Sequence, residues 1–258
     1  MENTKIKKIN LKSLIGHVAL LFVCLSLANA KVSGISPFLF AFLFACVFVG
    51  VNEKVMAGFC LASAVVVDLS LESFLIALTS VAVCLINYYI HRLIKRKINL
   101  ATNICVYLLS LCTYIYYNFH NMWNLCAYLV LGLISLCVFT CVCQVMILRR
   151  NCFKLTLDET ICFLFAIAVL GLGVATVDIF GFEVYKLVLM LTIFVSVSVG
   201  NATLTFALTL AFGSGVAIGL NSLLPIAEFA IISLLCSMFS MPNKVKICIS
   251  ALLGASFV

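Results

Sequence analysis

Charged residues are scarce in this chain of 258 residues: they make up 10% of it, whereas a soluble domain has about 25%. Hydrophobic residues make up 65%, and the mean hydropathy is +1.28. No globular core could bury so much apolar surface, so lipid must be the solvent for most of it. The apolar runs are continuous and lack the alternation of a β-barrel. The composition therefore predicts an all-α, polytopic bundle of transmembrane helices.

Motifs for soluble catalysis are also missing. The chain has no GxSxG, HExxH or P-loop pattern, and its aspartates, Asp68, Asp158 and Asp178, all lie at the ends of apolar runs. The 14 cysteines include no CxxC pair and lie almost wholly in apolar runs, where cysteine behaves as a small hydrophobe. We therefore expect no catalytic residue, no bound metal and no cofactor in this chain.

The apolar runs predict about ten spans within residues 13–246, between a basic tail (1–12) and a further run (247–258) that we expect to be truncated. The expected spans are 13–30, 37–51, 55–68, 69–90, 100–117, 123–148, 161–177, 184–199, 203–220 and 223–240. The second and third runs are short, because 15 residues of helix reach only about 22 Å of a core about 30 Å thick. They form either two short spans or a re-entrant hairpin, and both return the chain to the same side.

A possible cleavage site follows the first apolar run. Ala28-Asn29-Ala30 has the small-x-small pattern of a signal peptidase site, and a basic segment precedes the run. Because further spans follow at once, we favour an uncleaved first span over a cleaved signal peptide.

The net charge of +7 is placed in the loops, which indicates membrane topology and no nucleic-acid partner. With the N-terminus in the cytoplasm, only Lys31 and Lys186 of the 16 basic residues lie outside. The others lie inside, at positions 5, 7, 8, 12, 54, 92, 95, 96, 97, 149, 150, 154, 244 and 246. This asymmetry predicts a multi-pass protein of the bacterial cell membrane with a cytoplasmic N-terminus.

Three features are candidates for a defined role. Thr156 and Glu159 form a capping box at the start of an apolar run, because the Thr side chain and the Glu side chain can each satisfy a free N–H at the helix start. Gly215 and Gly219 form a GxxxG pattern, which allows two helix backbones to approach closely.

Glu228 is a carboxylate inside an apolar run, which marks an ion or proton path by default. Its position three residues after Pro225 also favours a structural role near a helix start.

Aromatic side chains cluster around the middle of the chain, and we interpret them as a belt at one membrane interface. They are Tyr107, Tyr114, Tyr116, Tyr117, Trp123 and Tyr128.

Several short patterns resemble the membrane region of the stage II sporulation protein E family. Ile35-Ser36-Pro37-Phe38 after a first span resembles the start of that region. Leu155-Thr156-Leu157-Asp158-Glu159, then Gly171-Leu172-Gly173 and the Phe180-Gly181 turn, resemble its later half, as do the glycine-rich span up to Gly219 and the turn at 241–246. The resemblance covers most of the chain and depends on the order of the patterns.

The resemblance implies about ten spans that anchor a cytoplasmic PPM-type serine/threonine phosphatase at the division septum. In that family the phosphatase dephosphorylates an anti-sigma-factor antagonist, and the cytoplasmic part contacts the tubulin-like division protein. These 258 residues contain no counterpart of the manganese-binding aspartates, so no catalytic residue is carried over. We therefore expect an anchor and assembly domain that binds the bilayer and self-associates. The alternative is a transporter of small solutes or lipids with Glu228 in its path.

Overall fold

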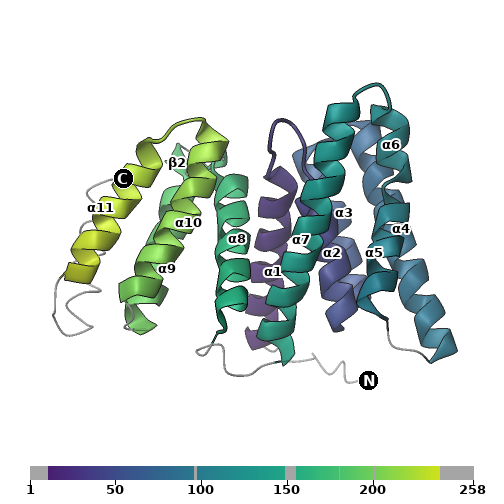
Figure 1. Ribbon diagram of the computed structural model, residues 1–258, viewed down its shortest axis with the longest axis horizontal. Coiled ribbons are helices and arrows are strands. Elements are labelled where there is room, and N and C mark those ends of the chain that lie inside the picture. Colours follow the sequence, from purple (N-terminus) through teal and green to yellow (C-terminus); the bar gives the residue numbers. More distant parts are fainter. Residues whose placement is uncertain (1–10, 96–97, 149–154, 180, 200–201, 239–258) are drawn as a thin grey trace, which may run out of the picture.

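The computed structural model describes residues 11–95, 98–148, 155–179, 181–199 and 202–238, and these are mostly helical. The helices stand side by side and run alternately up and down, so that the chain reverses at one end of the bundle and then at the other (Figure 1). The basic tail, the turns at 149–154 and 241–246, and the apolar run at 247–258 lie outside the described residues.

Eleven helices and one small hairpin make up the described chain. They are α1 (Leu11–Asn29), α2 (Phe38–Val49), α3 (Glu53–Val67), α4 (Leu71–Ile94), α5 (Leu100–Ser110), α6 (Cys112–Asn118), α7 (Met122–Leu148), α8 (Leu157–Val174), β1 (Asp178–Ile179), β2 (Phe182–Glu183), α9 (Val184–Val199), α10 (Ala202–Leu220) and α11 (Leu224–Met238).

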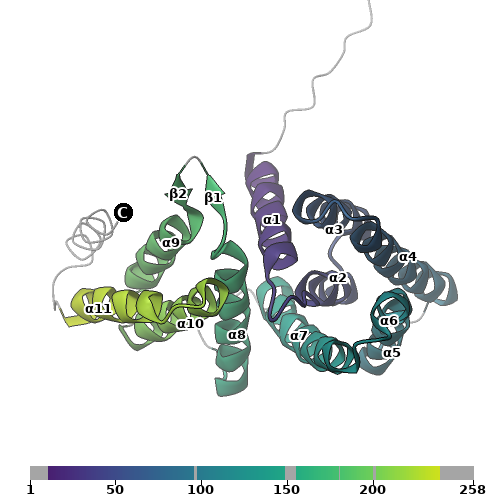
Figure 2. The same cartoon turned by 90° about the horizontal axis from the view of Figure 1, so that it is seen from above.

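Helix α2 lies at the centre of the first half of the bundle. It has 12 residues, all apolar, and it packs against α1, α3, α4, α5 and α7 (Figure 2). Nine of its side chains are buried. Gly50 ends the helix at a φ of 98°, a left-handed conformation that glycine adopts without strain. An all-round apolar helix is expected where protein covers every face.

Helix α8 joins the two halves. Seen from above, α1 and α7 lie on one side of it, and α9 and α10 lie on the other (Figure 2). The most extensive helix pairing in the described chain is between α8 and α10, so the second half is built onto α8.

Four helical stretches in the described chain are long and apolar enough to cross a membrane. They are Leu71–Ile94, Leu100–Asn118, Met122–Ile147 and Leu157–Val174. Shorter apolar helices lie at Ile15–Asn29, Phe38–Val49, Phe206–Leu220 and Leu224–Ser233. The structure is thus that of a helical, membrane-compatible bundle. In the described chain, however, the length criterion is met by four helical stretches, one of which comprises α5 and α6, and not by the expected ten.

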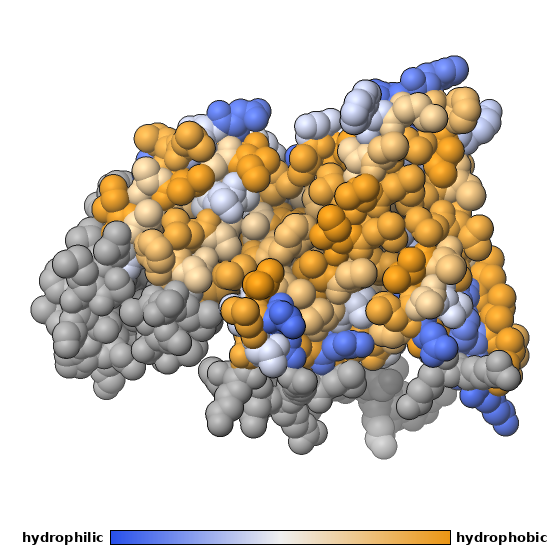
Figure 3. All heavy atoms as spheres, in the orientation of Figure 1, coloured by the Kyte–Doolittle hydropathy of each residue, from blue (hydrophilic) through white to orange (hydrophobic). Residues whose placement is uncertain are grey.

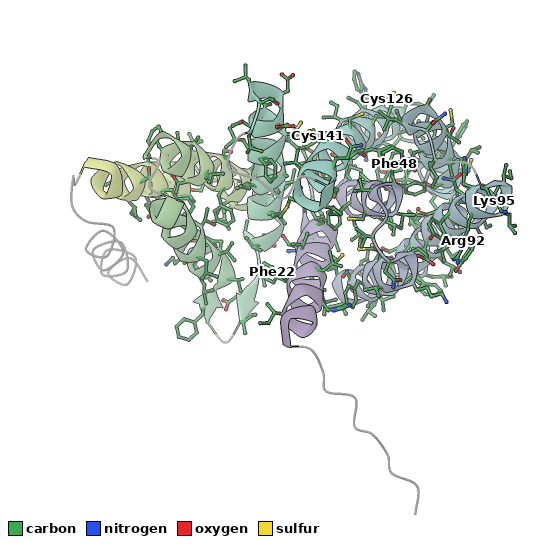
Figure 4. All side chains as sticks on the ribbon, turned by 90° about the horizontal axis from the view of Figure 1, so that it is seen from below. Phe22, Phe48, Arg92, Lys95, Cys126 and Cys141 are labelled. Carbon is green, nitrogen blue, oxygen red and sulfur yellow. The ribbon has the colours of Figure 1, made fainter. Side chains whose placement is uncertain are left out.

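An apolar band covers the flank of the bundle and gives way to polar residues at its ends (Figure 3). In the described chain, large side chains such as Ile86, Leu109 and Val130 are more than half exposed. Such a surface matches the hydrocarbon core of a bilayer. At one end, Arg92 and Lys95 stand at the outer rim, where α4 finishes (Figure 4).

Two segments differ in detail from the elements that the sequence predicts. The run 100–117 is divided into α5 and α6 at Leu111, whose ψ of −5° departs from regular helix. The acidic turn after α8 closes as an antiparallel hairpin, with Asp178 opposite Glu183 and Gly181 at a φ of 83°. Two-residue strands in a loop leave the helical character of the fold unchanged, although it is not strictly all-α.

Candidate functional site

The capping box is present at the start of α8. The Thr156 backbone N–H donates to Oε2 of Glu159 at 2.9 Å, and the Glu159 N–H donates to Oγ1 of Thr156 at 3.4 Å. The helix begins at Leu157, four residues before the apolar run predicted from Ile161. These two residues therefore fix where α8 begins, and their role is structural.

Gly215 and Gly219 lie where α10 crosses α8. A Cβ added to Gly215 would collide with the carbonyl oxygen of Ala168 and would lie 2.8 Å from the backbone nitrogen of Leu172. A Cβ added to Gly219 would lie 2.5 Å from the Cβ of Ala175. Successive contacts advance in the same direction along both helices, so α8 and α10 run parallel.

Two glycines of helix α8 also lie at close contacts between helices. A Cβ on Gly171 would collide with the carbonyl oxygen of Phe212 in α10. On another face of α8, a Cβ on Gly173 would collide with the carbonyl oxygen of Ser26 in α1. Close backbone contact therefore joins α8 to both α1 and α10.

Polar groups reinforce the contact between α1 and α8. Asn29 donates from Nδ2 to the carbonyl oxygen of Gly173 at 2.8 Å and to Oγ1 of Thr176 at 3.0 Å. Ser26 donates from Oγ to the carbonyl oxygen of Leu170 at 3.1 Å. The Ala28-Asn29-Ala30 sequence is thus part of a helix interface, with Ala28 and Ala30 buried.

Glu228 lies half-buried in the second turn of α11. Its neighbour Phe229 is buried and packs near Phe212 of α10 and Tyr185 of α9, each with ring centroids 6.3 Å apart. Glu228 is close enough to Tyr185 to interact with it electrostatically. The structure brings Glu228 to the boundary of this aromatic cluster, and it does not bring Glu228 together with the capping box.

A cavity of about 260 Å3 opens at the end of the bundle opposite Arg92 and Lys95. It lies between the α1–α2 loop, the α3–α4 turn and helices α6 and α7. Three charged residues line it, Lys31, Asp68 and Glu72. Its other polar lining residues are Ser36, Ser70, Ser73, Tyr114, Asn118, Asn124 and Tyr128. This convergence of polar groups on one concave surface makes the cavity the candidate functional site.

The carboxylates of the cavity are fixed by local hydrogen bonds. The Ser70 N–H donates to Oδ1 of Asp68 at 3.0 Å, and this bond holds the pKa of Asp68 below its usual value. Asn118 donates from Nδ2 to Oε1 of Glu72 at 3.3 Å, which links α6 to the first turn of α4. Asp68 is consequently ionised at neutral pH.

Two tyrosines and Phe40 form the aromatic part of the cavity wall. The rings of Tyr114 and Tyr128 are stacked, with centroids 3.8 Å apart and an interplanar angle of 25°. Tyr128 is 2% exposed, and its hydroxyl has no hydrogen-bond partner in the described structure. Tyr107 is also buried, with its ring edge-on to Phe44 of α2.

These positions correct the prediction of a single aromatic belt. Trp123 and Tyr116 are 87% and 77% exposed and suit a membrane interface, whereas Tyr107 and Tyr128 are core residues. Sequence reasoning also missed the cavity, because Lys31 lies 37 positions before Asp68 in the chain, and the residues of α6 and α7 that complete the lining lie still further along it. The one available signal was the recurrence of tyrosine and asparagine over residues 103–128.

Comparison of the chain with protein-family models, curated proteins and solved structures found no match. Within the part of the chain that the structure describes, no three His, Cys, Asp or Glu side chains are grouped so that they could hold a metal ion. The functional conclusions therefore depend on the residues themselves.

Proposed function

We propose that this chain is the membrane anchor and assembly domain of a protein of the stage II sporulation protein E family. In this proposal the domain has about ten spans, lies in the bacterial cell membrane with its N-terminus in the cytoplasm, and self-associates at the division septum. The phosphatase activity, its manganese, and the contacts with an anti-sigma-factor antagonist and a tubulin-like division protein would belong to a region outside these 258 residues.

One observation carries the proposal. The patterns that resemble the family lie at structural junctions of the bundle: the capping box begins α8, Gly171 and Gly173 are contact points of α8, and Gly215 is the matching contact point of α10. Residues that hold helices together are what an anchor requires. The apolar flank supports the bilayer as the principal partner.

The proposed topology gives the first test. Reporter fusions placed after Lys97, Lys154 and Lys246 should be active on the cytoplasmic side, and fusions near Asn121 and Phe182 should be active outside. The reason is the concentration of Lys and Arg in the first set of loops. A fusion after Lys154 that reports the outside would exclude the ten-span arrangement.

A second test separates an anchor from a transporter. In an anchor, Glu228→Gln should leave the septal enrichment of a fluorescent fusion within about twofold of wild type, because Gln retains hydrogen-bonding capacity without charge. In a proton- or ion-coupled transporter the same change should abolish function, because an amide does not titrate near neutral pH. The measurement is fluorescence at the septum of a sporulating cell, divided by total membrane fluorescence.

Glu183→Gln is the matched control, since Glu183 is an exposed carboxylate in the nearby hairpin. The anchor proposal is abandoned if Glu228→Gln removes function from a protein of normal abundance while Gly215→Leu has no effect.

A further inference from the structure

The cavity at the Asp68 end of the bundle has no part in the anchoring role. Asp68 and Glu72 stabilise the start of α4, where negative charge is favoured by the helix dipole. That role accounts for two carboxylates, but it leaves the cavity itself and the hydroxyl of Tyr128 without an explanation. Leaving a buried hydroxyl unpaired costs about 1–3 kcal/mol.

The charged residues around the cavity indicate the charge of the ligand that it would bind. Two carboxylates and one ammonium group line it, so the lining carries a net negative charge. The carboxylate of Asp68 is held ionised by Ser70, and Glu72 is held in place by Asn118. Anionic ligands are disfavoured in such a site, while an organic ammonium group would find two acceptors.

The aromatic wall of the cavity and the cavity volume narrow the class of ligand further. The ring of Tyr114, which is stacked on that of the buried Tyr128, offers an aromatic surface to a cation. A volume of about 260 Å3 is near the lower limit of small-molecule sites, which suits a metabolite and excludes a folded peptide segment. Lys31 on the α1–α2 loop adds a partner for a carboxylate.

We propose that this cavity binds a small organic ammonium compound of the basic amino acid class. Its ammonium groups interact with Asp68 and Glu72, its carboxylate with Lys31, and its chain lies along the ring of Tyr114. The complementary charges are those of a ligand with two positive groups and one negative group. The site lies at the end of the bundle that also carries Asp178 and Glu183 (Figure 1).

The experiment is isothermal titration of the purified full chain in nanodiscs with L-lysine, cadaverine and L-glutamate. L-lysine is expected to bind, cadaverine to bind more weakly because it lacks the carboxylate, and L-glutamate to show no binding. Glu72→Gln should weaken lysine binding about tenfold, because the substitution removes one charged acceptor. The amide oxygen of the new side chain can still accept the hydrogen bond from Asn118. Lys31→Gln should weaken binding of lysine but not that of cadaverine, because Lys31 pairs with the carboxylate of lysine and repels the two ammonium groups of cadaverine.

Glu183→Gln again provides the matched control, because it removes a carboxylate at the same end of the bundle but outside the cavity lining. Gel filtration and circular dichroism of each variant establish that it is folded. The proposal is overturned if glutamate binds as well as lysine, if Glu183→Gln weakens binding as much as Glu72→Gln, or if neither amine binds the folded wild-type chain at millimolar concentration. Loss of septal localisation does not bear on these outcomes, so this proposal and the anchor proposal fail separately.

Discussion

Gly215→Leu is expected to destabilise the folded protein strongly. The first carbon of the new side chain would collide with the Ala168 carbonyl oxygen, and that atom belongs to a helix backbone that cannot rotate away. The two helices would have to separate along the most extensive helix pairing in the described chain. Overpacking a core costs about 1–3 kcal/mol, and a backbone collision lies at the upper end or beyond. Because total stability is only about 5–15 kcal/mol, the variant should lose its folded fraction at a clearly lower temperature than wild type.

The measurement is the monodisperse fraction of a fluorescent fusion after detergent extraction, as a function of temperature. Gly58→Leu is the matched control: Gly58 is also a helical glycine, in α3, and nothing lies within 4 Å of an added Cβ there. We expect Gly58→Leu to extract like wild type. Equal behaviour of the two variants would contradict the crossing of α8 and α10 at Gly215.

Gly173→Leu should detach α1 from α8. Its new side chain would meet both the carbonyl oxygen and the hydroxyl of Ser26, and the bond from Asn29 to the Gly173 carbonyl would be lost. The combined cost is about 3 kcal/mol or more. The separation would uncover Ala28 and Ala30, which flank the possible cleavage site and are buried in the wild type.

N-terminal sequencing of membrane-extracted protein is the measurement. The wild type should retain its first span, whereas a cleaved form beginning at Lys31 should accumulate in Gly173→Leu. Gly16→Leu serves as the control within α1, because the space around Gly16 is open. A wild-type protein that begins at Lys31 would show that α1 is a removable signal peptide.

Local patterns in the sequence were sufficient to predict the helical class and several helix boundaries. The capping box predicted a helix start, and the structure has α8 beginning directly after Thr156. The continuous apolar run of residues 123–148 predicted α7 almost to the residue. Both follow from interactions within a few residues of one another, which a single sequence makes visible.

Partners far apart in the chain could not be predicted in the same way. The GxxxG pattern indicates a close helix contact but does not say that Gly215 would face Ala168. Nor could spacing show that Tyr107 and Tyr128 are buried while Trp123 is exposed. Both faces of a membrane helix are apolar, so the periodicity of hydrophobic residues does not distinguish the buried face from the lipid-facing one. The cavity needs four separate segments to come together, and its detection depended on the structure.

The central position of α2 has a consequence for how the chain is made. Helix α2 is finished when synthesis reaches Val49, but its neighbour α7 ends about 100 residues later, at Leu148. At the usual rates of translation that interval is about 5–20 s. During it, α2 must remain in lipid without its final neighbours, and its lack of polar side chains allows this at no hydrogen-bonding cost. A charged or amide side chain placed in α2 would therefore impair biogenesis before it could affect the finished bundle.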